Sequence, residues 1–98
     1  MEEHIREIID SDSAIKSGGY FDSHFVIETL LRDERYTADY VRYVALKTGD
    51  QNSVADAHGQ LALLVKAQDD LVEPVTDGKS FSRDIHGHIY PCELWRKK

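Results

Sequence analysis

Apolar positions recur at helical spacing most clearly over residues 53–68. They fall on one helical face together with a single histidine: Val54, Ala57, His58, Leu61, Leu64 and Val65. Because residues three or four positions apart share a helix face, the pattern predicts an amphipathic helix. Ser53, followed three residues later by Asp56, is a weak capping box that favours a helix start here. We expect Leu61, Leu64 and Val65 to be buried in the core.

The N-terminal residues carry a weaker helical pattern. Ile5, Ile8 and Ile9 lie at helical spacing and predict a helix over residues 1–9. The polar residues that follow weaken the pattern, and the glycine pair at 18–19 ends it. This helix therefore ends either near Ile9 or near Lys16.

Two further helices are predicted between these patterns. Asp22 can accept hydrogen bonds from free amides at a helix start, and Phe21 and Val26 are placed for a hydrophobic staple around it. Thr37 is the candidate cap of the next helix, and Gly49 is placed to end that helix in a left-handed conformation. Between Thr37 and Gly49, the apolar stripe of this helix consists of Tyr40, Val41, Val44 and Ala45.

After residue 70 the pattern changes to short extended segments. Residues 71–75 are typical of an edge strand, since Pro74 cannot donate a ladder hydrogen bond. Asp77-Gly78 and His86-Gly87 are turn signals. The other extended segments are residues 81–85, 88–90 and 92–96. The tail therefore predicts a hairpin or small meander, which we expect Trp95 to anchor on the helices.

Taken together, the patterns predict an α+β fold in one domain spanning residues 1–98. Three to four helices make up most of it, followed by a C-terminal β-hairpin or small meander. That order resembles a winged helix, with residues 37–47 and 53–68 as the helix-turn-helix pair, residues 48–52 as the turn between them and the tail as the wing. The resemblance is one of architecture, and a helical bundle with a β appendage fits the same order.

Charge divides the chain into an acidic body and a basic tail. The net charge is −6, and residues 79–98 carry five Lys or Arg against two Asp or Glu. The tail is thus +3 and residues 1–78 are −9. An acidic body argues against a broadly basic nucleic-acid binder. Two interpretations of the tail remain, a solvated basic segment and a local anion-binding or nucleic-acid-binding edge. The edge would consist of Lys79, Arg83, Arg96, Lys97 and Lys98.

Three tyrosines gather around the third predicted helix. They are Tyr36, Tyr40 and Tyr43. Aromatic side chains with a polar tip can anchor a protein interface, and they can also pack a core while their hydroxyls reach the surface. The sequence leaves both interpretations open.

No set of residues in the sequence assembles into recognised chemistry. His86 and His88 fall on one face of an extended segment, with Cys92 and His58 as further ligand types, but no pair has a recognised zinc spacing. The run from Asp22 to His24 does not make a catalytic triad, because adjacent helical residues point in different directions. Cys92 is the only cysteine, so no internal disulfide can form, and a small buried residue is its expected role. We predict no enzyme activity, no metal and no cofactor.

The sequence thus favours a non-enzymatic binding module, either a protein-interaction or a regulatory domain that engages a protein partner or a second copy of itself. The alternative is a winged-helix-like domain that binds nucleic acid through its basic hairpin. The longest apolar run, residues 61–65, is too short to span a bilayer, so no membrane association is expected. The acidic N-terminus and the single cysteine predict a cytoplasmic location.

Overall fold

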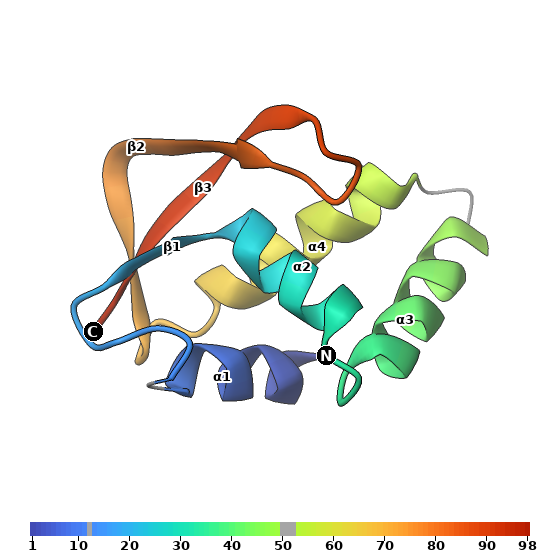
Figure 1. Ribbon diagram of the computed structural model, residues 1–98, viewed down its shortest axis with the longest axis horizontal. Coiled ribbons are helices and arrows are strands. Elements are labelled where there is room, and N and C mark those ends of the chain that lie inside the picture. The colour runs from blue at the N-terminus through green and yellow to red at the C-terminus, as the bar shows by residue number, and fades with distance from the viewer. Residues whose placement is uncertain (12, 50–52) are drawn as a thin grey trace.

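Four helices and a three-stranded antiparallel sheet form the part of the chain that the computed structural model describes, residues 1–11, 13–49 and 53–98 (Figure 1). The helices are α1 (Glu2–Asp10), α2 (Ser23–Arg32), α3 (Thr37–Gly49) and α4 (Val54–Lys66). The strands are β1 (Tyr20–Asp22), β2 (Val72–Arg83) and β3 (Ile89–Lys97). The predicted α+β class, with helices preceding a C-terminal hairpin, is confirmed.

Side-chain caps determine where two of the helices begin. The Ser53 hydroxyl accepts the Asp56 amide at 3.0 Å, and the Asp56 carboxylate accepts the Ser53 amide at 3.0 Å, which completes the capping box of α4. Asp22 accepts the amide of Phe25 at 2.8 Å and caps α2 as predicted. The first helix takes the shorter of its two predicted lengths and ends at Asp10.

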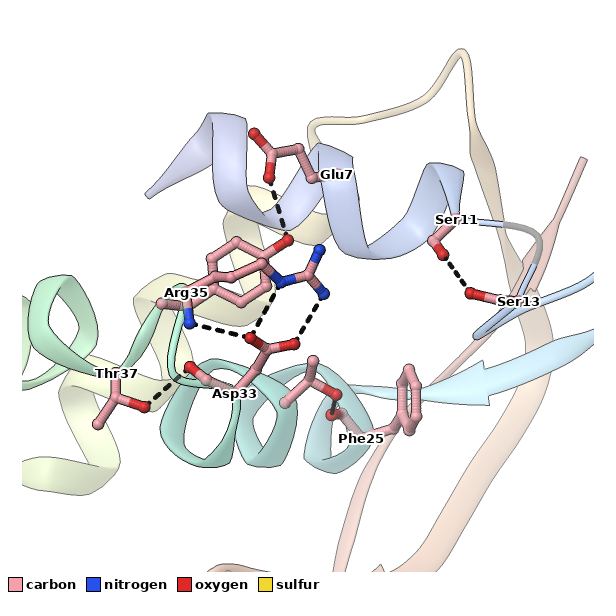
Figure 2. A network of polar contacts seen from close by, with 9 residues as sticks. Glu7, Ser11, Ser13, Phe25, Asp33, Arg35 and Thr37 are labelled. Atoms are coloured by element: carbon pink, nitrogen blue, oxygen red, sulfur yellow. Dashed lines mark hydrogen bonds and ion pairs between the residues drawn. The ribbon is translucent and has the colours of Figure 1, made fainter.

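The ends of α3 differ from the prediction. Thr37 does not cap the helix, because it is the first helical residue. Its hydroxyl donates to the carbonyl oxygen of Asp33 (Figure 2) and to that of Leu31, both at 2.8 Å. These bonds fasten the start of α3 to the end of α2. Gly49 is the last residue of α3 and does not have a left-handed φ; the described glycines that do are Gly18 (φ +82°) and Gly87 (φ +79°). Of the predicted turn over 48–52, residues 50–52 lie outside the described residues.

Strand β3 is the centre of the sheet, which has the order β1-β3-β2. Trp95 of β3 pairs with Phe21 of β1 on one side and with Pro74 of β2 on the other. Pro74 therefore lies on an edge strand, as its missing amide hydrogen required. The turn predicted at Asp77-Gly78 is wrong, because these residues continue β2 through a register shift between Pro74 and Lys79. The turn predicted at His86-Gly87 is confirmed, since the chain reverses at residues 84–88.

The core lies where the four helices meet the end of the sheet at which all three strands pair, around Phe21, Val72 and Trp95. Large side chains from four separate elements are almost fully buried in it, with Ile5, Leu30 and Leu61 at 0% and Trp95 at 2% exposure. The Trp95 indole donates to the Ser23 hydroxyl at 3.1 Å, so the prediction that the tail packs back onto the helices is confirmed. Leu64 is only half-buried, so the predicted α4 core face is narrower than expected. Within the described part of the chain, no helix has the length and apolar character needed to cross a membrane.

The hairpin arches over α2 and α4, while α3 lies at the edge of the molecule away from the sheet (Figure 1). Helices α3 and α4 contact each other, and the β2–β3 hairpin follows them directly. The architecture thus keeps its resemblance to a winged helix, with β1 as a third strand that the sequence patterns did not predict. Two main-chain bonds extend the β1–β3 pairing, from the Gly18 amide to the Lys97 carbonyl (2.8 Å) and from the Lys97 amide to the Gly19 carbonyl (2.9 Å).

Candidate functional site

A cavity of about 540 Å³ lies between three parts of the fold. They are the turn end of the β2–β3 hairpin (residues 79–93), α4 from Val54 to Ala62, and the start of α2. Its apolar lining comes from all three elements and consists of Ile27, Val54, Ala55, Ala62, Ile85 and Pro91. Gly59 also lines it, and a Cβ placed on that residue would meet nothing within 4 Å. The glycine at position 59 is therefore not required by close packing, because a side chain there would have open space around its Cβ.

Three imidazoles from three different elements line this hollow: His24 from α2, His58 from α4 and His86 from the hairpin turn. Nε2 of His58 lies 2.7 Å from the Tyr40 hydroxyl, and Nδ1 of His24 lies 2.8 Å from the Ser82 hydroxyl. Burial lowers the pKa of His58, and the nearby His86 and His24 lower it further. His58 is therefore a neutral side chain at neutral pH, held in one orientation by the Tyr40 phenol.

The acidic side chains around the hollow already have partners. Asp84 accepts the amides of His86 (2.9 Å) and His88 (3.0 Å), and these bonds lower its pKa. Glu93 accepts a hydrogen bond from Lys79 at 2.6 Å across the hairpin.

The structure does not assemble the candidate chemistry considered from sequence. Ser23 accepts the Trp95 indole and His24 meets Ser82, so the run from Asp22 to His24 is divided among separate contacts. Burial raises the pKa of the half-buried Cys92 thiol, which is the opposite of what an activated nucleophile requires. Among the described residues, no group of three or more His, Cys, Asp or Glu side chains is arranged to hold a metal ion.

The tyrosines around α3 point into the molecule. Tyr36 and Tyr40 are buried, at 2% and 4% exposure, and Tyr43 is half-buried. The Tyr36 hydroxyl donates to Glu7 of α1 at 3.0 Å, and the Arg35 guanidinium lies over the Tyr36 ring, 5.1 Å from its centre (Figure 2). Of the two interpretations left open by the sequence, the geometry matches core packing with hydroxyls that reach polar partners. Tyr36 and Tyr40 are covered by this chain itself and offer no surface to another protein.

The opposite side of α3 is exposed and largely apolar. It consists of Ala38, Val41, Arg42, Ala45 and Leu46, which we call the α3 outer face, and it is bordered by exposed Asp39, which pairs with Arg42 at 3.6 Å. Val41 is 53% exposed and Leu46 is 67% exposed. Sequence reasoning placed Val41 and Ala45 in one stripe with the core residue Tyr40. The sequence signal that could have indicated this exposed face was the width of the apolar arc on α3. A helix whose apolar residues extend beyond one core-facing stripe has a second apolar face that the core does not bury.

Most tail cations of the predicted anion-binding edge are engaged within the fold. Lys79 pairs with Glu93 and Arg96 pairs with Glu73, both at 2.6 Å. Lys97 is buried, and its ammonium donates to the Ile15 carbonyl at 2.8 Å. Arg83 and Lys98 are exposed. Arg83 donates to the backbone carbonyl of Gly87 at 2.6 Å, and Lys98 donates to the backbone carbonyl of Asp69 at 2.7 Å. The five side chains do not converge on one anion site.

No protein-family model, no curated protein and no solved structure matches the chain.

Proposed function

We propose that this chain is a non-enzymatic binding module that recognises a protein surface through the α3 outer face. The observation that carries the proposal is the distribution of side chains on α3, where Tyr40 is buried and Tyr43 half-buried while the solvent side keeps Val41 and Leu46 exposed. Single exposed apolar residues are ordinary on protein surfaces. Several exposed apolar residues grouped on one helix face, with the Arg42–Asp39 pair (3.6 Å) beside them, are characteristic of an interaction site.

Burial of Val41 and Leu46 alone does not offset the cost of association. Covering the exposed parts of Val41 and Leu46 contributes on the order of 2–4 kcal/mol. Association costs roughly 4–15 kcal/mol of translational and rotational freedom. The interface must therefore extend over the small residues Ala38 and Ala45, which allow a second helix to approach α3 closely. A second copy of the chain is the simplest partner, because a two-fold arrangement covers the same face on both copies.

Sedimentation of the protein at increasing concentration, up to about 0.5 mM, tests self-association. We expect a reversible dimer that Val41→Glu and Leu46→Glu each weaken by at least about tenfold, because a desolvated carboxylate opposes an apolar contact. Ile89→Glu is the matched control, since Ile89 is equally exposed, at 62%, and lies on the hairpin. A monomer at every concentration would refute self-association. If Ile89→Glu weakened the dimer as much as Val41→Glu and Leu46→Glu do, the interface would not be specific to α3.

Nucleic-acid binding is the second candidate, favoured by the order of α3, α4 and the hairpin. The charges oppose it. The α4 surface carries Asp56 and one lysine, Lys66, while the body of the chain is −9. Neutralisation of phosphates by cations supplies most non-specific affinity for DNA. Among the tail cations described above, the exposed ones whose given contacts are to backbone carbonyls and not to carboxylates are Arg83 and Lys98. We therefore rank this function below protein binding.

A further inference from the structure

We propose that the hollow between α4 and the hairpin binds a small primary amine with an apolar body, and that the Asp84 carboxylate at the hairpin turn holds its ammonium group. This site is separate from the α3 outer face and goes beyond the proposed protein-binding function. The lining of the hollow, the balance of charge around it and the hydrogen bonds of Asp84 carry the proposal.

The walls of the hollow set the body of the ligand. Its volume of about 540 Å³ lies within the range of roughly 300–1,000 Å³ that small-molecule sites occupy. Aliphatic side chains come from every element around it, with Ile27 on α2, Val54 and Ala62 on α4, and Ile85 and Pro91 on the hairpin. Apolar ligand atoms gain free energy when they leave water for such walls, so a short alkyl chain or a small ring is the body that fits.

The charged groups of the lining favour a cation over an anion. Among the described residues that line the hollow, the carboxylates are Asp84 and Glu93, and the lysine is Lys79, which pairs with Glu93 at 2.6 Å. No described residue forms a salt bridge with Asp84, so its negative charge is the one left over. Because burial lowers the pKa of His58, this ring is neutral and does not repel a cation. The net charge of −6 also draws cations toward the molecule as a whole.

The hairpin turn fixes the Asp84 carboxylate and leaves one of its oxygens open. Oδ1 accepts the amides of His86 (2.9 Å) and His88 (3.0 Å), and these bonds lower the pKa of Asp84, so the group is ionised at neutral pH. Oδ2 receives no hydrogen bond from the part of the chain that the structure describes. A primary ammonium carries three donors, and a hydrogen bond between two charged groups is roughly twice as strong as a neutral one. Since Ile85 beside Asp84 also lines the hollow, an ammonium on Oδ2 directs its apolar body toward the aliphatic walls.

Hexylammonium, 1-hexanol and hexanoate are the probes, because they share one apolar body and differ in the charge of the head group. Amide chemical shifts of the full chain follow binding at about pH 7.5, where the amine is protonated and the acid is ionised. We expect saturable shifts with hexylammonium, centred on Val54, Ala55 and Ile85, and a dissociation constant below about 10 mM. Hexanol should bind at least about fivefold more weakly, and hexanoate more weakly still, because Asp84 attracts the cation alone.

Two variants separate the carboxylate from the walls. Asp84→Asn should weaken hexylammonium at least about fivefold and change 1-hexanol less than about twofold, because asparagine keeps an oxygen for the two amides but has no charge. Asp69→Asn is the matched control, since Asp69 is exposed and does not line the hollow. Gly59→Leu should weaken both ligands at least about tenfold, because Gly59 lines the hollow and has open space around its Cβ, which a larger side chain takes up.

Several results would overturn the proposal. They are the absence of saturable hexylammonium binding up to about 10 mM, equally tight binding of 1-hexanol or hexanoate, unchanged binding to Asp84→Asn or Gly59→Leu, and an equal loss in Asp69→Asn. If a variant melts at a lower temperature than the parent chain, the comparison of the three probes on the parent chain decides. None of these results would alter the sedimentation test of the α3 outer face.

Discussion

The three leucines of α4 provide a graded test of where the core lies. Leu61 is fully buried, Leu64 is half-buried, and Leu63 is 57% exposed on the outside of the same helix. The same substitution at each position removes the same atoms and changes helix propensity equally, because alanine and leucine are both good helix formers. Differences in stability between the three variants therefore report packing alone.

The burial of each side chain gives the expected magnitudes. Leu61→Ala removes a side chain from full contact and leaves a cavity, so it should cost about 2–5 kcal/mol. Leu64→Ala should cost about half as much, and Leu63→Ala less than about 0.5 kcal/mol. Domains of this size are stable by roughly 5–15 kcal/mol, so the first variant should shift the urea midpoint strongly.

Urea unfolding followed by Trp95 fluorescence and by far-ultraviolet circular dichroism measures the series. Trp95 is a suitable probe because it is buried against the α2 start, where its indole donates to Ser23. The denaturant slope should stay constant, so that midpoint changes are stability changes. A cost below about 1 kcal/mol for Leu61→Ala, or an equal cost for Leu63→Ala, would refute the placement of α4 at the centre of the fold.

Three further predictions concern pH, the tail and nucleic acid. The folded-state pKa of His58 is lowered, so its contribution to stability is full above the unfolded pKa of about 6.5 and is lost as pH falls through the folded value. Unfolding free energies from pH 7 to 5 should therefore decline less steeply in His58→Gln, and equal slopes would show that His58 does not titrate as described. Truncation after Pro91 removes the buried Trp95, so thermal melting should show a large loss of stability, and an unchanged melting temperature would make the tail an independent arm. Random-sequence DNA should bind weakly, with a logarithmic salt slope no steeper than about −3; submicromolar binding at about 0.2 M salt, abolished by neutralising Arg83 and Lys98, would favour the nucleic-acid function instead.

Local signals in the sequence were sufficient for much of the fold. The Ser53–Asp56 capping box and the Asp22 cap depend on residues three positions apart, so the pattern contains all the information needed. Trp95 was recognisable as an anchor because it is the only tryptophan of the chain and the largest apolar side chain of the tail. Strand β1 was missed because three residues are too few for a periodic signal, and it forms only by pairing with β3 more than seventy residues later.

The candidate sites depended on long-range contacts that no local pattern encodes. Tyr40 meets His58 across 18 residues and His24 meets Ser82 across 58, so the hollow exists only once the hairpin lies over α2 and α4. Asp77-Gly78 has the composition of a turn, but the pairing of both halves of β2 with β3 carries the strand through it. The apolar arc of α3 could not be divided into core and surface before its packing partners were known.

The most direct test of the protein-binding function is photo-cross-linking inside the native cell. A photoreactive phenylalanine derivative replaces Leu46 on the α3 outer face, and the same derivative replaces Ile89 on the hairpin as the control. We predict a protein adduct from position 46, at twice the chain mass for a self-complex or at a discrete larger mass for another partner, and none from position 89. Adducts from neither position, or from position 89 alone, would contradict the assignment of the α3 outer face as the binding surface.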